Sequence, residues 1–274
     1  MTHPLLTLND GRVMPQLGFG TWRISNDEAA AAVREAIRAG YALIDTAAVY
    51  GNERGVGEAL AGAGETWVTT KVWNDAHGRR RTRAALAASL ERLGREHVEL
   101  YLIHWPVPSS DLYLETWEAL IELREEGRAR SIGVSNFDAA QIERLERETG
   151  VLPAVNQIEL HPRFQQRELS AFHRDKGIAT QSWSPLGKGG LLDDPTIGAV
   201  AERRGASPAQ VVIAWHLQKG FSVIPKASDP NHMRDNFGAL GVELEKEDME
   251  ALAALDDPRG RTGPDPADFE LDAV

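Results

Sequence analysis

Cysteine is absent from this chain of 274 residues. Its absence excludes disulfides, thiolate nucleophiles and zinc sites with cysteine ligands, and it is compatible with a reducing compartment. Residues 1–16 lack the basic stretch followed by an apolar one that a secretory signal needs. Apolar runs also fall short of the roughly 18 residues that span a bilayer. We therefore expect a cytoplasmic protein with no membrane partner.

Positive charge is scarce. The chain has 30 lysines and arginines against 41 aspartates and glutamates, a formal net charge of −11. An acidic surface repels phosphate backbones, so we expect no nucleic-acid partner, and an anionic ligand would need a local positive pocket. The eight histidines form no HExxH or similar spacing, and we expect no metal site.

What the sequence does contain is a regular alternation of strand and helix patterns. Asn9-Asp-Gly11 between short apolar runs predicts an N-terminal β-hairpin. Strands are then expected at 17–19, 42–45, 66–71, 98–104, up to 135, 154–159, 179–183 and 221–225. Helices are expected at 26–39, 52–61, 81–93, 112–126, 139–149, 166–176, 195–204, 208–219, 230–237 and 245–255. Eight alternating strands in this length predict one domain over 1–274, an α/β (β/α)₈ TIM barrel with the N-terminal hairpin and extra helices near the C-terminus.

Polar residues gather at the expected carboxyl ends of these strands. They are Asp45, Lys71, His104, Ser135, Asn136, Gln157, Glu159, Trp183, Ser184 and Lys226. In a barrel these ends face the mouth, where active sites lie. Each such group would cost several kcal/mol at least if it were buried and unpaired, so we expect them to pair with one another or with a ligand.

Three of these residues and a nearby phenol suggest proton-transfer chemistry. Lys71 beside Tyr50 would favour the phenolate and lower the phenol pKa from about 10, while Asp45 would keep the lysine charged. A phenol tuned in this way suits an alkoxide that forms near neutral pH, and His104 could orient a carbonyl oxygen. Since no side chain can supply a hydride, a cofactor must do so.

Eight ordered motifs resemble those of a known family. They are Leu17–Trp22, Asp45–Asn52, Thr70–Trp73, Leu100–Pro106, Ile132–Phe137, Asn156–Pro162, Trp183–Gly187 and Ile224–Lys226. With these motifs the chain resembles the aldo-keto reductases over nearly its whole length, most closely the bacterial 2,5-diketo-D-gluconate-reductase-like branch. The resemblance implies NAD(P)H-dependent reduction of aldehydes and ketones to alcohols, usually by a monomer.

The same resemblance implies roles for individual residues. The catalytic tetrad would be Asp45, Tyr50, Lys71 and His104. Ser135, Asn136 and Gln157 would contact the nicotinamide carboxamide, and Trp183 would stack on the ring. The pyrophosphate would lie under Ser184–Gly187, where backbone N–H groups can bind anions. The other predicted cofactor residues are Gly20, Thr21, Leu186, Lys226, Ala227, Ser228, His232 and Asn236.

The substrate would meet an aromatic wall. Trp22, Trp73 and Trp105 all follow strand ends and, with Val49 and His104, are the predicted substrate residues. The tail from Arg261 to Val274 is short, which predicts an open and tolerant pocket.

The adenosine-phosphate segment departs from the family pattern. Ala227 stands where a serine is common, His232 where an arginine is common, and Asp229 adds a negative charge. A 2′-phosphate would lose a bidentate partner. We therefore expect NADP(H) as the cofactor and NAD(H) to be accepted as well.

Two other classes of protein are compatible with parts of the pattern. A non-catalytic nicotinamide-binding barrel, acting as a redox sensor or accessory subunit, would not need the intact set of four residues. A barrel hydrolase could use Glu159 and Asp45 as paired carboxylates but would leave Tyr50 and Lys71 unexplained.

Overall fold

The computed structural model describes residues 3–269, and its centre is one sheet of eight parallel strands. The strands are β3 (Phe19–Gly20), β4 (Leu43–Asp45), β5 (Trp67–Val72), β6 (Val98–Ile103), β7 (Ala129–Ser135), β8 (Val155–Glu159), β9 (Ala179–Trp183) and β10 (Ser222–Val223). They are hydrogen-bonded in chain order from β3 to β10. The sheet closes where Leu17 bridges Val223 and the Gly18 N–H donates to the Val223 carbonyl at 2.8 Å. The predicted (β/α)₈ barrel is confirmed.

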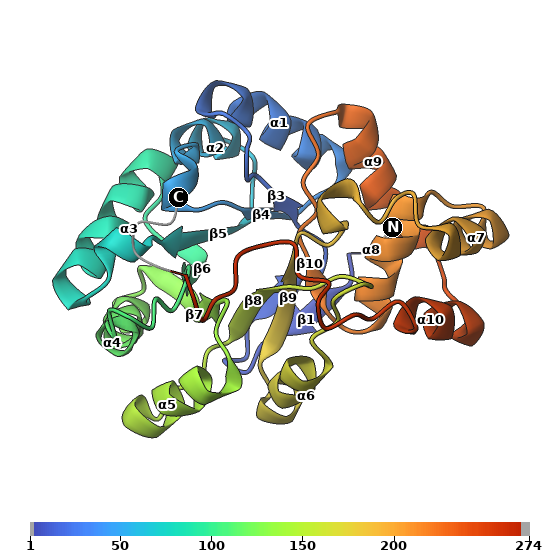
Figure 1. The fold of residues 1–274 in the computed structure, drawn as a ribbon. Coiled ribbons are helices and arrows are strands. Elements are labelled where there is room, and N and C mark those ends of the chain that lie inside the picture. The colour runs from blue at the N-terminus through green and yellow to red at the C-terminus, as the bar shows by residue number, and fades with distance from the viewer. Residues whose placement is uncertain (1–2, 270–274) are drawn as a thin grey trace.

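Helices surround the strands on the outside, as Figure 1 shows. They are α1 (Asn26–Ala39), α2 (Glu53–Leu60), α3 (Arg79–Leu93), α4 (Tyr113–Glu125), α5 (Ala139–Thr149), α6 (Arg167–Lys176), α7 (Pro195–Arg204), α8 (Pro208–Gln218), α9 (Pro230–Gly238) and α10 (Lys246–Ala253). Capping residues in the sequence explain where some of these helices begin and end. Asp138 accepts from the Gln141 N–H at 2.7 Å and caps α5, and Gly40 ends α1 with φ of 113°.

The predicted hairpin is also present and closes one end of the barrel. It pairs β1 (Leu5–Thr7) with β2 (Val13–Pro15) in antiparallel register. Leu8 and Met14 from this hairpin lie in one apolar cluster with Leu100 and Ile224 of the barrel interior. Because this end is plugged, a ligand can reach the interior side chains only from the opposite end, where the strands finish.

Four single turns of 3₁₀ helix were not predicted. They are η1 (Ala48–Tyr50), η2 (Asn74–Ala76), η3 (Gly187–Gly189) and η4 (Ala239–Gly241). A turn of three residues is too short to show a periodic apolar pattern, so sequence periodicity cannot detect it. The difference matters for function, because η1 carries Tyr50 at the mouth and η3 lies in the predicted pyrophosphate loop.

The packing of α1 on α2 predicts a stability difference between two helical glycines. A Cβ at Gly55 of α2 would lie 2.2 Å from the Asn26 carbonyl oxygen, whereas a Cβ at Gly198 of α7 would meet nothing within 4 Å. Gly55→Ala should lower the free energy of unfolding by about 1–3 kcal/mol through overpacking. Gly198→Ala, the control, should leave it unchanged or raise it by up to about 1 kcal/mol. Urea unfolding measures both, and a fully stable Gly55→Ala would contradict this packing.

Candidate active site

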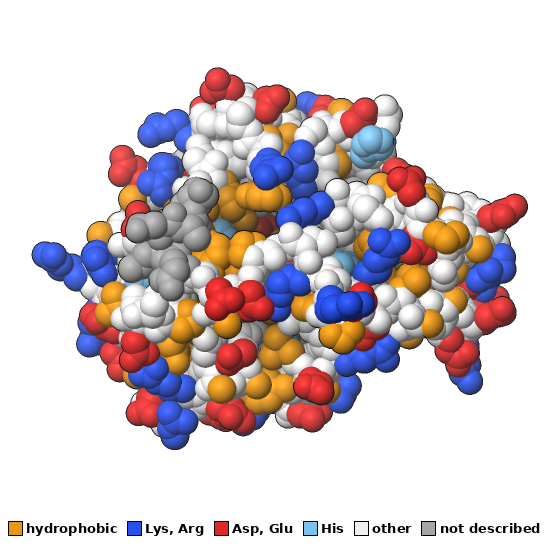
Figure 2. Space-filling view, viewed as in Figure 1, with side chains coloured by type: hydrophobic (Ala, Val, Ile, Leu, Met, Phe, Trp, Pro, Cys, Tyr) orange, Lys and Arg blue, Asp and Glu red, His pale blue; other side chains and the backbone are white. Residues whose placement is uncertain are grey.

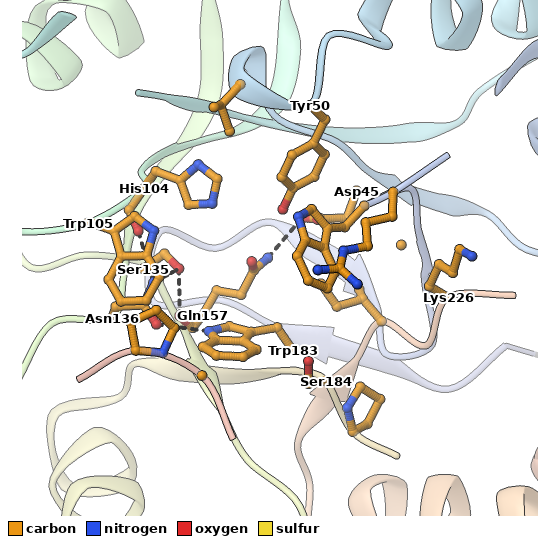
Figure 3. Close-up of a pocket in the computed structure, with 18 of the residues that line it drawn as sticks. Asp45, Tyr50, His104, Trp105, Ser135, Asn136, Gln157, Trp183, Ser184 and Lys226 are labelled. Carbon is orange, nitrogen blue, oxygen red and sulfur yellow. Dashed lines mark hydrogen bonds between the residues drawn. The ribbon is translucent and has the colours of Figure 1, made fainter. Parts of the chain in front are cut away.

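A cavity of about 470 Å³ opens where the strands end, and most of the predicted site residues line it (Figure 3). Those that do are Gly20, Trp22, Asp45, Val49, Tyr50, Trp73, His104, Trp105, Ser135, Asn136, Gln157, Trp183, Ser184 and Lys226. A second cavity of about 700 Å³ continues from it and is lined by Leu186, Ala227, Ser228, His232 and Asn236. Trp22, Ser184 and Lys226 belong to both, so the two cavities form one groove.

Three predicted residues line neither cavity. Lys71 is fully buried behind the first one, and Gly187 lies in the loop at its edge. Thr21 is also buried, and both its N–H and its hydroxyl donate to the Asp45 carbonyl at 3.0 Å. Thr21 therefore supports the end of β4 from behind.

Asp45 and Lys71 form a buried ion pair. The Lys71 ammonium lies 2.7 Å from one carboxylate oxygen of Asp45, and the two side chains are 0% and 2% exposed. The ammonium also donates to the Thr46 carbonyl at 2.9 Å. Burial raises the pKa of Asp45 and lowers that of Lys71, while their mutual attraction opposes both shifts. The pair is neutral as a whole, which allows it to remain inside the barrel wall.

The Tyr50 loop is held by a buried asparagine that the sequence reading did not single out. Asn52 donates to the carbonyl oxygens of Thr21 and Ile24, both at 3.0 Å, and accepts from the Thr46 hydroxyl at 2.7 Å. The loops after β3 and β4 are thereby joined. They place the Tyr50 ring 5.7 Å from the His104 ring and 5.2 Å from the Lys71 nitrogen.

The expectation that Lys71 lowers the pKa of Tyr50 is wrong. Burial, and then the negative charge of Asp45, raise the pKa of Tyr50 well above its ordinary value. The Lys71 charge, which is paired with Asp45, does not outweigh these two effects. Burial, and then the Lys71 charge, also lower the pKa of His104 well below its ordinary value. The structure thus holds a neutral phenol beside a neutral imidazole.

Hydrogen bonds connect the polar groups on the floor of the cavity: the Asn136 amide donates to the Ser135 hydroxyl at 3.1 Å, and that hydroxyl donates to the Gln157 carbonyl at 2.7 Å (Figure 3). Gln157 donates to Asp45 at 2.8 Å and to Gln181 at 2.7 Å. Asn136 accepts from the Trp183 indole N–H at 2.8 Å and donates to the His104 carbonyl at 3.0 Å. This network fixes the plane of the Trp183 indole and links it to the ion pair.

Of the three tryptophans predicted to form an aromatic wall, Trp73 and Trp105 pack against other rings of the cavity, whereas Trp22 lies apart from them. The Trp73 ring lies 5.0 Å from His104, and Trp105 stacks on Phe269 with ring centroids 4.0 Å apart and an angle of 9°. Trp22 lines the same cavity but is 43% exposed and packs beneath the Arg23 guanidinium at 4.4 Å. Phe269 was not predicted, because its position depends on the path of the tail.

Cations gather along the groove even though the chain as a whole is acidic. Arg23, Lys188 and Lys226 line both cavities, and Figure 2 shows a central hollow with Lys and Arg side chains at its rim. The backbone φ is positive at Lys188 and also at Ser184, Gly187 and Gly189, so the loop that contains η3 is irregular. An apolar chamber joined to a cationic groove fits an elongated ligand with a phosphate-bearing half. Arg23 was absent from the predicted set, although it directly follows Trp22 in the first motif.

The structure gives no indication of a metal or a membrane span in the part it describes. Within residues 3–269, no three His, Asp or Glu side chains lie together in a way that could hold a metal ion. Over the same range, no helix is both long and apolar enough to cross a bilayer.

A barrel with a phenol, an imidazole and a buried ion pair at its mouth, beside a cationic groove, is the arrangement expected of a nicotinamide-dependent oxidoreductase. Residues 16–257 match the Aldo/keto reductase family. An aldo-keto reductase of Mycobacterium sp. (strain KMS) is 48% identical over 99% of both chains. Methylglyoxal reductase DkgA of Escherichia coli K12 is 48% identical over 98% of this chain and 99% of that protein.

Solved structures agree with these matches. A mutant of Gox0644 in complex with NADPH has a TM-score of 0.97 and 47% identity, covering 98% of this chain and all of that one. A Bombyx mori aldo-keto reductase in complex with NADP has a TM-score of 0.90 and 37% identity, with 98% of each chain covered. The chain belongs to the aldo/keto reductase family and is an NAD(P)H-dependent carbonyl reductase.

The buried ion pair predicts a pH-dependent cost of removing Lys71. In Lys71→Met, Asp45 loses its counter-ion and its pKa, already raised by burial, should rise further. An acid whose pKa is raised in the folded state destabilises that state more as pH increases. The loss of unfolding free energy should reach about 3–5 kcal/mol at pH 8 and be smaller at pH 5.

Urea unfolding at both pH values, relative to wild type, measures this difference. In the double variant Asp45→Asn/Lys71→Met no unpaired charge remains, so much of the stability at pH 8 should return. A loss that is equal at both pH values, or larger at pH 5, would show that Asp45 does not carry an uncompensated charge.

Proposed function

We propose that Tyr50 is the proton donor of this reductase, and that Lys71, Asp45 and His104 support it. The observation that carries the proposal is the position of the phenol and the imidazole, which line the same cavity as Trp183. A general acid must hold its proton at working pH, and the raised pKa of Tyr50 meets this requirement.

Each of the four side chains has a distinct task in this proposal. When bound, the nicotinamide cofactor supplies the hydride that goes to the carbonyl carbon. Tyr50 gives its proton to the carbonyl oxygen, and the Lys71 ammonium stabilises the phenolate that remains. His104 donates a hydrogen bond to the same oxygen. Its Nδ1 is buried, so the nitrogen that faces the substrate is Nε2.

We propose that the cofactor occupies the groove with its nicotinamide on Trp183. Ser135, Asn136 and Gln157 would exchange part of their mutual network for the carboxamide. The adenosine end would lie in the second cavity among Lys226, Ala227, Ser228, His232 and Asn236. Gly20, Ser184, Leu186 and Gly187 would border the path between them, and Thr21 would act indirectly through Asp45.

We propose small, reactive carbonyl compounds as substrates, methylglyoxal among them. Relatives at 46–48% identity are named methylglyoxal reductases. The cavity fits a compact substrate, because Trp22, Val49, Trp73 and Trp105 line it around Tyr50 and His104. Hydrolysis by paired carboxylates has little support, because Asp45 is bound by Lys71 and Glu159 is bound by Thr262. The monomeric state, the cytoplasmic location and the lack of a nucleic-acid partner stay predictions from the sequence.

We further propose that the enzyme accepts NADH in addition to NADPH, with a weaker preference for NADPH than relatives that carry arginine at position 232. At the adenosine end Lys226 donates to the Ser228 hydroxyl at 2.6 Å, and Asp229 caps α9. His232 lines the cavity without a guanidinium's planar fork of donors. Only one permanent cation of this segment therefore faces a 2′-phosphate.

The proton donor is tested by Tyr50→Phe. The variant should fold and bind NADPH nearly as wild type does, but lose roughly 10²–10⁴-fold in kcat with methylglyoxal, because general acid catalysis is worth that much. Tyr113→Phe is the control, since the Tyr113 hydroxyl contacts Arg144 and the residue does not line the cavity. Retention of more than about a tenth of wild-type kcat under chemistry-limited conditions would exclude Tyr50 as the acid.

Cofactor choice is tested by His232→Arg. A guanidinium at this position can bond a 2′-phosphate twice, and one charge-assisted hydrogen bond is worth about 1.5–3 kcal/mol. The NADPH/NADH ratio of kcat/KM should rise roughly ten- to hundredfold, with the value for NADH nearly constant. Asn231→Arg adds the same charge to α9 without lining the cavity and should change the ratio much less. A ratio within about twofold of wild type would show that residue 232 does not contact the phosphate.

A further inference from the structure

The chain after α10 returns to the barrel mouth instead of ending away from it. Residues 260–269, which we name the C-terminal strap, run in front of the strands in Figure 1. The strap starts in close contact with the segment after β8, where a Cβ on Gly260 would lie 1.9 Å from the Arg163 carbonyl oxygen. Its later residues Gly263, Pro264 and Phe269 line the catalytic cavity. The tail therefore forms part of the cavity wall, and the open, tolerant pocket expected from its short length stays a prediction.

One buried carboxylate holds the strap. Glu159 ends β8 and is 1% exposed. It accepts from the Thr262 N–H at 2.7 Å, the Thr262 hydroxyl at 2.5 Å and the Gly263 N–H at 3.0 Å. Burial alone would raise the pKa of Glu159, but the nearby His161 ring and the hydrogen bonds from Thr262 and Gly263 outweigh it and hold the pKa at about 2. The carboxylate is thus charged near neutral pH, and its bonds to the strap are charge-assisted.

A second contact comes from the loop at the predicted pyrophosphate position. The Lys188 ammonium donates to the Thr262 carbonyl oxygen at 2.6 Å. Thr262 is therefore held on both sides, by Glu159 through its two donors and by Lys188 through its acceptor. Since Lys188 also lines both cavities, the strap is connected to the loop that borders the cofactor groove.

The anchored residue sets the position of the groups that follow it. Gly263 passes so close to Trp183 that a Cβ there would lie 2.4 Å from the indole ring. Phe269, six residues later, stacks on Trp105 and lies 6.2 Å from the Trp73 ring. Release of Thr262 would remove the outer side of the cavity while leaving Tyr50 and His104 in place.

We propose that Glu159 is a positioning residue for substrate recognition, which with Lys188 fastens the C-terminal strap at Thr262 and so completes the wall that a bulky carbonyl substrate contacts. The proposal rests on the proposed function only in placing the substrate in this cavity. Fastening of the strap is a separate property that can be measured without turnover.

Fastening is tested by amide hydrogen exchange of the strap, followed by mass spectrometry on the full chain. In Glu159→Ala the amides of Thr262 and Gly263 lose their acceptor, and their exchange should accelerate at least tenfold. Glu159→Gln keeps one carboxamide oxygen for Thr262 and should give an intermediate rate. Asp248→Asn is the matched control, because Asp248 is equally buried but pairs with Arg203 and Arg204 on α7.

Recognition is tested by the kinetics of the same variants with two aldehydes. With 2-naphthaldehyde, which is large enough to reach the strap, Glu159→Ala should raise KM at least tenfold and change kcat less than threefold. With methylglyoxal, KM should change less than threefold, and so should the Kd for NADPH. Glu159→Gln should partly restore the KM for 2-naphthaldehyde, and Asp248→Asn should match wild type with both aldehydes.

Two results would overturn the proposal. One is strap exchange that stays at the wild-type rate in Glu159→Ala. The other is faster strap exchange with an unchanged KM for 2-naphthaldehyde, which would make Glu159 merely structural. Should Glu159→Ala fail to fold, Thr262→Val removes only the hydroxyl bond and should shift both measurements in the same direction. A wild-type chain that reduces neither aldehyde would contradict the proposed substrates, while the exchange data would still decide whether Glu159 fastens the strap.

Discussion

Two opposite charges 2.7 Å apart inside the barrel wall, on Asp45 and Lys71, are the constraint around which the site is arranged. Neither charge could stay there alone, because an unpaired buried ion costs several kcal/mol or neutralises itself. The second carboxylate oxygen of Asp45 and the Lys71 ammonium make further hydrogen bonds to neighbouring groups. The Gln157 amide donates to the second carboxylate oxygen of Asp45, and the Thr46 carbonyl accepts a hydrogen bond from the Lys71 ammonium. These hydrogen bonds link the ends of β4, β5 and β8 to one another beside Tyr50.

Charge is distributed over the molecule in a way that suits its ligands. The chain carries a net charge of −11, yet Arg23, Lys188 and Lys226 line one continuous groove. A local positive groove in an acidic protein attracts an anionic cofactor without making the whole surface attractive to phosphate backbones. The catalytic end is different, since its phenol and imidazole are both neutral and its walls are largely aromatic.

The short C-terminal strap forms part of the wall of the catalytic cavity. The C-terminal strap, residues 260–269, contributes a glycine beside Trp183 and a phenyl ring on Trp105. A loop has few contacts of its own, so its position depends on the groups that hold it. Here these are one carboxylate from β8 and one ammonium from the loop after β9, and the wall that they hold in place belongs to the catalytic cavity.

The sequence by itself determined the barrel, the hairpin, the helix caps and the polar strand ends, because each of these depends on residues close together in the chain. The alternation of strand and helix patterns predicted that Asp45, Lys71, His104 and Gln157 lie together at the carboxyl end of the barrel. Tertiary structure alone decided the rest. The raised pKa of Tyr50 depends on its burial and on the negative charge of Asp45, which only the folded chain places nearby. The function of Glu159 depends on Thr262, which lies 103 residues away, and no local pattern encodes a hydrogen bond across that separation.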